Sequence, residues 1–215
     1  MTRTLIAVDG PDGSGKSRFA ARLAAACGGA GAPAALVHVD DFRRPVDFDA
    51  ADDEAVAYYD RYYDFPALEA CLRAFLGGAG QVAIPRFDPA RGVLDGQLQV
   101  SFDDAALCVV EGVFVLRAPA ACAAPVILLE VGADEARRRI LARDGARGRA
   151  PAEIERRLAR RYLPSQRRYR AELDPVARAD VIVDNDRWDD PRLLRREMGR
   201  FPPAAAQALA RLFLP

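Results

Sequence analysis

Short apolar runs alternate along this chain with longer segments in which apolar residues recur every three or four positions. The short runs are rich in Val, Ile and Leu, as expected for strands that are buried on both faces of a parallel sheet. The longer segments have the spacing of amphipathic helices. This alternation predicts an α/β fold with a five-stranded parallel sheet flanked by helices. The predicted strands are 4–8, 34–39, 107–112, 125–131 and 181–183.

The helices and one hairpin complete this predicted order of elements. Two extended pieces between Gln81 and Phe102 flank the turn-rich sequence DPARGVLDG, which predicts a hairpin insert over about 80–102. We expect the hairpin to form one wall of a substrate site. The last helix is apolar enough to pack on the core or on a second subunit, so a homo-oligomer is one expectation. Helices are expected over 16–26, 51–63, 66–76, 134–144, 151–169, 191–200 and 203–212.

Composition is that of one folded domain. The chain has 215 residues, of which 51% are hydrophobic and 29% are charged. Its net charge is +0, so we expect neither nucleic acid nor an anionic membrane as a partner. We find no signal peptide and no apolar run of the roughly 18 residues that span a membrane, so a cytoplasmic location is expected. The 4 cysteines lack the spacing of a zinc site or a disulfide framework.

The sequence GPDGSGKS, residues 10–17, places the pattern G-x-x-x-x-G-K-S between an apolar strand and an amphipathic helix. Glycines there let backbone N–H groups converge on phosphate oxygens, and the helix N-terminus adds the positive end of its dipole. Lys16 is the only lysine among 31 Lys and Arg residues, and the planar fork of arginine fits so tight a nest poorly. A nucleoside triphosphate such as ATP is therefore expected on Gly10, Asp12, Gly13, Ser14, Gly15, Lys16, Ser17 and Arg18, with Ser17 also on Mg²⁺.

A phosphate-binding loop (P-loop) occurs in kinases, GTPases, motor ATPases and regulators, so the loop alone does not choose among them. GTPases usually carry an N-K-x-D element, and this chain has no second lysine with which to build one. A chain of 215 residues also leaves little room for a large ATPase machine. A small-molecule phosphotransferase is favoured, and a nucleotide-binding regulator without catalysis is the alternative from another class.

Two carboxylates follow predicted strands, at the edge of the sheet where ligands bind in α/β folds. Asp40, in VDDF, could accept the proton of an attacking hydroxyl, which favours an alcohol acceptor; a helix-capping or turn aspartate is the alternative. Glu111, in VVEG, could hold Mg²⁺ directly or through water, and Asp40 is a further metal candidate. An ordinary strand-end glutamate is the alternative for Glu111. His38 is more typical of a satisfied strand histidine than of a catalytic one.

Arginines are concentrated late in the chain, with thirteen between residues 151 and 200. Guanidinium groups on a mobile segment can neutralise the charge of a transferring phosphoryl group, so residues 137–170 are a candidate lid. The alternative is a solvated helix face with i, i+4 ion pairs, which accounts for many of these arginines.

The motifs G-x-x-x-x-G-K-S, VDDF, YDFPAL, IPRFD, VVEGVF, RRRILARDGARGR and ARADVIV follow one another in this order. Together they resemble the uridine kinase group of P-loop kinases, which includes phosphoribulokinase, pantothenate kinase and nicotinamide riboside kinase relatives. The resemblance covers about residues 3–184. It implies a P-loop NTPase fold with a hairpin insert and a helical lid, ATP and Mg²⁺ as cofactors, and a nucleoside-like acceptor.

The resemblance also implies a reaction and its residues. It implies transfer of the γ-phosphoryl group to the 5′-hydroxyl of a pyrimidine ribonucleoside, with Asp40 as the catalytic aspartate. A nucleoside monophosphate kinase is an alternative, because the loop also looks like those of thymidylate and cytidylate kinases; nicotinamide riboside or another small alcohol is a further one. Asp64, in DFP, matches an aspartate that binds ribose hydroxyls, and Phe87 matches a tyrosine that contacts the base. Arg143 and Arg147 are expected on the nucleotide, and Arg86, Arg139 and Arg149 on the substrate.

Overall fold

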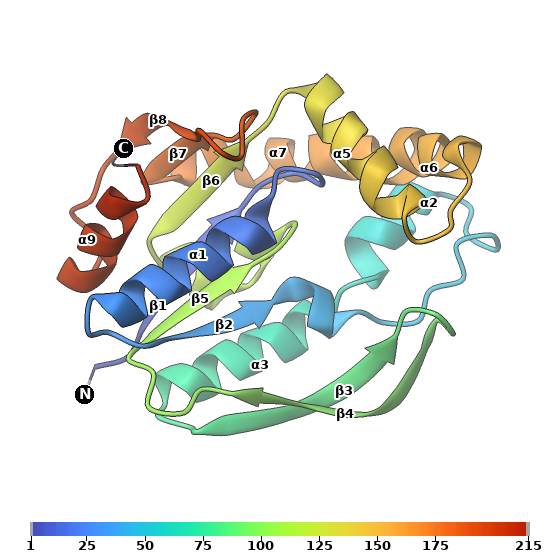
Figure 1. Cartoon of the computed structure of the whole chain (residues 1–215). Coiled ribbons are helices and arrows are strands. Elements are labelled where there is room, and N and C mark those ends of the chain that lie inside the picture. Colours follow the sequence, from blue (N-terminus) through green and yellow to red (C-terminus); the bar gives the residue numbers. More distant parts are fainter. Residues whose placement is uncertain (1, 214–215) are drawn as a thin grey trace.

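A computed structural model describes residues 2–213 of the chain (Figure 1). A six-stranded sheet in the order β2-β5-β1-β6-β7-β8 forms its centre. The first five strands of this order are parallel, which confirms the predicted parallel sheet, and β8 pairs antiparallel with β7. The parallel strands are β1 Thr4–Asp9, β2 Ala34–His38, β5 Leu107–Glu111, β6 Val126–Glu130 and β7 Val181–Asp184.

Strand β8, Arg192–Arg196, corrects the sequence prediction, which expected a helix over 191–200. Its residues alternate between exposed and half-buried, with Leu193 against the core and Leu194 exposed. The sequence RLLRR is too short for its apolar positions to distinguish a helix from a strand. Tertiary structure favours the strand, because β8 supplies hydrogen-bond partners to the backbone groups of β7 on the side that β6 does not pair.

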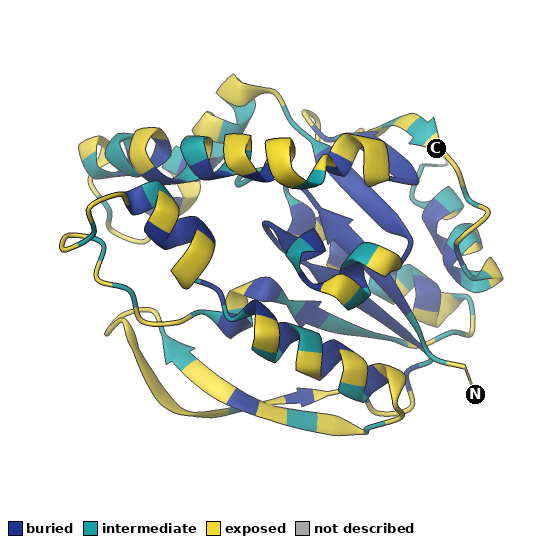
Figure 2. Ribbon diagram, turned by 180° about the vertical axis from the view of Figure 1, so that it is seen from behind, coloured by how far each residue is buried: buried dark blue, intermediate teal, exposed yellow. Residues whose placement is uncertain are grey.

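Helices cover both faces of the sheet, whose strands are mostly buried (Figure 2). Alternate strand residues supply two cores, as the two-residue period of a strand requires. Ile6 and Val8 belong to the core under α1 and α9, whereas Leu5 and Ala7 face α3 and α4. The C-terminal helix therefore packs on the core. These helices are α1 Lys16–Gly29, α3 Phe65–Leu76, α4 Pro119–Ala123 and α9 Pro203–Arg211.

The predicted hairpin is present as β3, Gln81–Asp88, and β4, Val93–Ser101. It forms a separate two-stranded sheet beside α3 (Figure 1). Ile84 and Val100 are buried in the core on the α3 side, while most other hairpin residues are exposed or half-buried. The hairpin is thus anchored at its base, and its turn extends toward the carboxyl edge of the sheet.

The arginine-rich segment forms a helical layer above that edge (Figure 1). Ile140, Ile154 and Leu158 make a small core of their own between its helices. Among residues 2–213, no helix is long and apolar enough to cross a membrane. The layer consists of α5 Ala133–Gly145, α6 Pro151–Arg157, a π-helical turn Leu158–Tyr162 and α7 Leu163–Leu173, followed by α8 Pro175–Arg178.

The predicted helix over 51–63 is shorter and less regular than expected. Helix α2 covers Glu54–Val56 and continues as a π-helical turn, Ala57–Arg61. Asp53 begins it by accepting hydrogen bonds from the N–H groups of Ala55 and Val56. The residues before Asp53 therefore stay outside the helix, because the capping aspartate ends the extended chain there.

Candidate active site

The turn between β1 and α1 has the conformation of a phosphate-binding loop. Gly13 and Gly15 have φ angles of 79° and 86°, in the left-handed region that favours glycine. A Cβ atom on Gly13 would lie 2.7 Å from the carbonyl oxygen of Ala136, and one on Gly15 would lie 2.8 Å from Asn185 Nδ2. The loop therefore requires glycine both for its backbone and for the close approach of neighbouring segments.

Helix α1 begins directly after this loop, with Gly15 as its N-cap. Gly15 has no side chain that could cap the helix, so no side-chain oxygen accepts a hydrogen bond from the N–H groups of the first turn. These N–H groups are therefore open to an anion. Lys16 is 8% exposed, and its Nζ donates a 2.8 Å hydrogen bond to the Pro11 carbonyl oxygen. Its ammonium group therefore lies across the loop, within reach of any phosphate bound there.

Two polar atoms of the loop lack a partner. Asp12 Oδ2 and Ser14 Oγ are buried and have no hydrogen bond to any of residues 2–213. Burial raises the pKa of the Asp12 carboxyl, against the positive charges of Lys16 and Arg143, which lower it. Buried polar atoms in native proteins nearly always have partners, so these two mark a place where a ligand or water completes the bonding.

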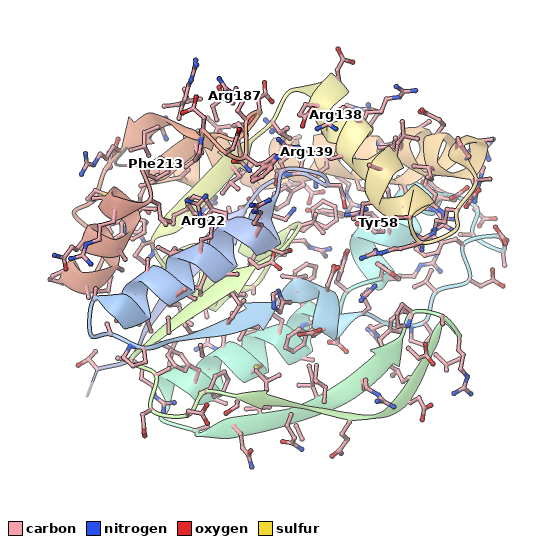
Figure 3. The ribbon with its side chains drawn as sticks, in the orientation of Figure 1. Arg22, Tyr58, Arg138, Arg139, Arg187 and Phe213 are labelled. Atoms are coloured by element: carbon pink, nitrogen blue, oxygen red, sulfur yellow. The ribbon has the colours of Figure 1, made fainter. Side chains whose placement is uncertain are left out.

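The loop is braced by side chains from distant parts of the chain. Asn185 Nδ2 donates a 2.6 Å hydrogen bond to the Ser14 carbonyl oxygen. Arg139 donates to the Gly13 carbonyl oxygen at 3.3 Å and to those of Asn185 and Asp186 at 2.7 Å each. Figure 3 shows Arg139 on α5 beside the loop. Arg139, predicted to bind substrate, is thus committed to carbonyl groups behind the loop, and its substrate role stays a prediction.

Asp40 lies in a 3₁₀ turn, Val39–Phe42, that directly follows β2. Its side chain is exposed and borders a cavity beside the P-loop. The Tyr63 hydroxyl donates a 3.4 Å hydrogen bond to Asp40 Oδ1. Burial raises the pKa of Tyr63 well above its usual range, so this hydroxyl keeps its proton and remains a donor. Asp40 Oδ2 accepts no hydrogen bond from residues 2–213, so it has no competing partner there.

Glu111 ends β5, is 4% exposed, and has one oxygen 2.6 Å from His38 Nδ1. The hydrogen bond to Glu111 raises the pKa of His38, although burial acts against it. Burial alone would raise the pKa of Glu111, but the His38 hydrogen bond, the charge of Lys16 and the Ser17 hydroxyl lower it below its usual value. The carboxylate is therefore held ionised and oriented. His38 is a satisfied strand histidine, as predicted, and its partner is the candidate metal ligand.

A cavity of about 290 Å³ opens where β1, β2 and the helical layer meet. Its size is at the lower end of the range for small-molecule sites. Asp12 and Asp40 border it, and so does Phe87 of the hairpin. That the hairpin forms a wall of the substrate site stays a prediction. Tyr58, labelled in Figure 3, lies among the aromatic side chains on its inner wall. The arginines that line it are Arg43, Arg143, Arg147, Arg149, Arg157 and Arg161.

Three of the predicted nucleotide- and substrate-binding arginines thus reach the same cavity. Asp144 is buried and pairs with Arg143 at 2.7 Å and with Arg149 at 3.1 Å. Arg147 is exposed and has no carboxylate within 4.0 Å among residues 2–213. A buried aspartate therefore orients two arginines toward the cavity, while Arg147 is not fixed by an ion pair. The closing motion of a lid stays a prediction.

Two other predicted substrate residues do not reach the cavity. Asp64 is the N-cap of α3 and accepts a 3.0 Å hydrogen bond from the Ala67 N–H, with Arg44 at 3.7 Å. Arg86 donates to the Asp95 carbonyl oxygen across the hairpin and is exposed there. Local partners explain both positions: a helix start needs a capping oxygen, and the antiparallel partner strand offers a carbonyl. Their roles in substrate binding stay predictions.

Arg18, predicted to contact the nucleotide, follows Ser17 on α1. Its guanidinium group lies 3.6 Å from the centroid of the Trp188 ring. Gly15 and Asn185 line a small crevice with these two residues. Trp188 was not among the predicted site residues, because no pattern around it in the sequence pointed to Arg18.

The sequence analysis also missed Asp9, which is fully buried directly before the loop. Its carboxyl group accepts hydrogen bonds from the Gly10 N–H and the Tyr169 hydroxyl, both at 2.7 Å. Burial raises the pKa of Asp9 to about 6, although these hydrogen bonds and the charges of Lys16 and Arg170 lower it. A charged residue at the end of a buried strand was the available signal. Asp9 links the loop to α7 of the helical layer.

The residues present fit a magnesium ion that arrives with a triphosphate. Within residues 2–213, no group of three or more His, Cys, Asp and Glu side chains is placed to hold a metal alone. Ser17 and Glu111 nevertheless lie close enough for the hydroxyl to affect the carboxyl pKa. Both supply oxygen atoms, and Mg²⁺ usually takes one or two protein oxygens together with phosphates and waters. Asp40, across the cavity edge, is the further metal candidate.

Three solved structures with this fold are similar over most of the chain. A possible uridine kinase from Bacillus stearothermophilus is 21% identical, with 85% of this chain and 89% of that one covered and a TM-score of 0.64. A candidate fructose transport system kinase from Silicibacter sp. TM1040 is 24% identical, with 79% and 85% covered and a TM-score of 0.61. Phosphoribulokinase from Rhodobacter spheroides is 17% identical, with 85% and 70% covered and a TM-score of 0.56.

No family model matches the sequence, and no curated protein does. The likeness to known proteins is therefore one of fold, at low sequence identity. It agrees with the resemblance seen in the order of the motifs, since the same group of kinases appears in both. The chain has the α/β fold of the uridine kinase and phosphoribulokinase group of P-loop kinases.

Proposed function

We propose that this protein is an ATP-dependent kinase that transfers the γ-phosphoryl group to a hydroxyl group of a small molecule. The observation that carries the proposal is the position of Asp40. Its carboxylate borders the same cavity as Asp12 of the P-loop, so a phosphate-binding loop and a candidate base face one open cavity. A kinase acting on a hydroxyl needs both within reach of the reacting atoms.

In this reaction the acceptor hydroxyl would give its proton to Asp40 as its oxygen forms a bond to the γ-phosphorus. The bond from that phosphorus to the bridging oxygen of ADP breaks, and ADP leaves with the bonding electrons. Lys16 and the N–H groups of the first turn of α1 would bind the phosphates. Arg143, held by Asp144, is placed near Asp12 of the loop to offset charge on the transferring group.

Magnesium, when bound, would offset the negative charge of the phosphates. Ser17 and Glu111 are the residues proposed to hold it. His38 would act through Glu111 by fixing its carboxylate, as residues behind a metal ligand often do. The cytoplasmic location, and a small-molecule partner in preference to nucleic acid, remain part of this proposal.

The acceptor proposed first from the motif resemblance is a pyrimidine ribonucleoside, phosphorylated at its 5′-hydroxyl. The aromatic side chains of the cavity, Phe87 among them, support a planar ligand. The proposal that Asp64 binds the ribose hydroxyls requires its carboxylate to serve α3 and the ligand together, since it caps that helix. Nucleoside monophosphates, nicotinamide riboside and other small alcohols are the alternatives.

The proposed function is tested by measuring ADP release from Mg-ATP across a panel of acceptors. The panel contains nucleosides, nucleoside monophosphates, nicotinamide riboside, pantothenate and sugar phosphates. We expect one alcohol to stimulate ADP release well above the acceptor-free rate, and the Asp40→Asn variant to abolish the stimulation. ATP binding without stimulation by any acceptor would instead favour a nucleotide-binding regulator.

A further inference from the structure

One wall of the cavity combines arginines with aromatic rings. The Arg161 guanidinium lies 3.9 Å from the Phe48 ring centroid, and the Arg43 guanidinium lies 5.2 Å from that of Phe87. The Tyr62 ring joins the two pairs, with centroid distances of 5.4 Å to Phe48 and 6.2 Å to Phe87. These five residues, the arginine–aromatic wall, form one continuous surface, and none of them belongs to the P-loop.

We infer that the arginine–aromatic wall binds an anionic group of the acceptor, a phosphate or a carboxylate, so that the substrate is an alcohol that also carries negative charge. This inference rests on the proposed kinase function and names the class of its acceptor. It favours a charged alcohol over the neutral ribonucleoside that the motif resemblance alone suggests. Asp40 would take the proton of the reacting hydroxyl as before, and the anionic group would take no part in bond making.

Both guanidinium groups of the wall are oriented through their Nε atoms. Arg43 Nε donates a 2.6 Å hydrogen bond to the Asp40 carbonyl oxygen, and Arg161 Nε donates to Glu54. The terminal nitrogens of Arg161 donate no hydrogen bond to residues 2–213, and Arg43 has no carboxylate within 4.0 Å there. A guanidinium fixed at Nε presents its remaining N–H groups as a fork, which is the geometry that binds phosphate and carboxylate.

The charge of the cavity favours the same class of ligand. Its lining contains six arginines and three aspartates, and two of the arginines, Arg157 and Arg161, also pair with glutamates behind the lining. Arg43 and Arg147 have no carboxylate within 4.0 Å among residues 2–213. Asp144 is already shared between Arg143 and Arg149, and Asp40 is reserved for the hydroxyl. A neutral acceptor could accept hydrogen bonds from these guanidinium groups but would leave the charge of the unpaired arginines without a counterion. An anionic group would accept stronger, charge-assisted hydrogen bonds and supply that counterion.

Burial makes the position of Arg161 informative. Arg161 is 5% exposed and Glu54 is 9% exposed, so this ion pair is taken out of water. Such pairs contribute little to stability, because desolvation offsets their attraction. Glu54 also accepts a hydrogen bond from Arg156, so it is placed to hold more than one guanidinium behind the wall. The pair fixes the Arg161 guanidinium at the edge of the cavity and leaves its terminal nitrogens without a hydrogen bond to residues 2–213. These nitrogens are the groups that would bind the anion.

The arginines proposed to bind the nucleotide have different neighbours from the two arginines of the arginine–aromatic wall. Burial acts to lower the pKa of Arg143, but the hydrogen bond and charge of Asp144, and to a smaller extent the charge of the nearby Asp12, raise it above its usual value. Arg43 and Arg161 instead contact rings from the hairpin and from the segment before α2. The cavity therefore has one cationic group beside the P-loop and another beside the acceptor, and each would bind its own anion.

The test compares acceptors in matched sets that share a carbon skeleton and differ by an anionic group: glycerol, glycerol 3-phosphate and glycerate; ribose and ribose 5-phosphate; uridine and its 3′-monophosphate. We expect kcat/KM for the charged member of at least one set to exceed that of its neutral partner by about 10-fold or more. Arg43→Gln and Arg161→Gln should raise KM for that acceptor by about 10- to 100-fold and leave KM for ATP unchanged. Arg73→Gln, at an exposed ion pair on α3, is the matched control.

The outcomes separate this inference from the proposed function. Turnover that prefers the neutral members, or that falls equally for both classes in the arginine variants, overturns the inference and leaves the kinase in place. No acceptor-dependent turnover from any compound overturns the proposed function itself. A binding measurement covers substrates outside the panel: with the P-loop saturated by Mg-AMP-PNP, inorganic phosphate should raise Tm of the wild type but not of Arg43→Gln. No shift in the wild type would overturn the inference.

Discussion

The two ends of the candidate site are built in different ways. At the phosphate end, the P-loop depends on backbone geometry: left-handed glycines, the start of α1, and carbonyl oxygens held by Asn185 and Arg139. At the acceptor end, the cavity depends on side chains from separate segments, such as Arg43, Arg161 and Phe87. One end is local in sequence, and the other exists only after folding.

Because of this difference, the residues proposed for phosphoryl transfer are separate from those proposed to select the acceptor. A loop that binds phosphate through N–H groups can serve many kinases, because it recognises only the part of the ligand that they share. In the proposed reaction, the acceptor end would decide which alcohol is phosphorylated, and its ion pairs can change without disturbing the loop. Variants of the phosphate end should therefore affect every acceptor alike, while variants of the acceptor end should distinguish one acceptor from another.

The largest effect is expected at the junction of the two ends. Asp40→Asn keeps the size of the side chain and removes the base, so turnover should fall by roughly 10²- to 10⁴-fold. ATP binding, measured by calorimetry, should change little, because Asp40 makes no contact with the P-loop backbone in the hydrogen bonds of the structure. An equal loss of ATP affinity would show that Asp40 serves the phosphate end instead.

Asp9 offers a test of stability at the phosphate end. Its pKa is raised to about 6 in the folded protein from the ordinary 3.8, so between pH 4 and 6 the unfolded chain binds fewer protons than the folded one. The free energy of unfolding should therefore fall as pH rises through this window, by about 2 to 3 kcal/mol from this group. Asp9→Asn removes the titration.

The measurement is the urea midpoint of both proteins at pH 4, 5, 6 and 7. The stability of Asp9→Asn relative to the wild type should rise from pH 4 to 6 and stay constant above. A parallel pair of curves would mean that Asp9 is ionised in both states, and Tyr169→Phe serves to separate the hydrogen bond from the burial.

Glu111→Gln is expected to have a smaller and more specific effect. The amide keeps the shape of the side chain but loses the charge that would hold Mg²⁺, so the Mg²⁺ concentration for half-maximal turnover should rise by about 10-fold. Activity at saturating Mg²⁺ should largely recover. Unchanged metal dependence, with activity reduced at every Mg²⁺ concentration, would leave Glu111 as a structural partner of His38.

Much of this organisation could be predicted from the sequence, and the limits have physical causes. The P-loop and the five parallel strands were recognisable because their signals are local: glycine positions, one lysine, and short apolar runs. Strand β8 was not, because RLLRR suits either structure until the edge of β7 is available. The pairing of Arg161 with Glu54 spans more than a hundred positions, and no spacing rule connects them.

The smallest effect is expected at Asp64, where two roles compete. As the N-cap of α3, its loss in Asp64→Ala should lower the free energy of unfolding by about 1 kcal/mol, whereas Asp64→Asn should keep the cap. The ratio of kcat/KM for uridine to that for 2′-deoxyuridine reports the ribose role. A ratio that collapses in both variants would support hydroxyl binding by the carboxylate; a ratio that stays constant would leave Asp64 with the cap alone.

The central claim is that the loop at residues 10–17 binds phosphate and that only the narrow ammonium group of a lysine fits at position 16. The most direct test is acceptor-dependent ADP release from Mg-ATP in the wild type and in Lys16→Arg, which keeps the charge and changes the geometry. We predict a loss of about 10²-fold or more with every acceptor, while Tm changes little, because the arginine fork does not fit the nest. Turnover in Lys16→Arg equal to that of the wild type would contradict the claim.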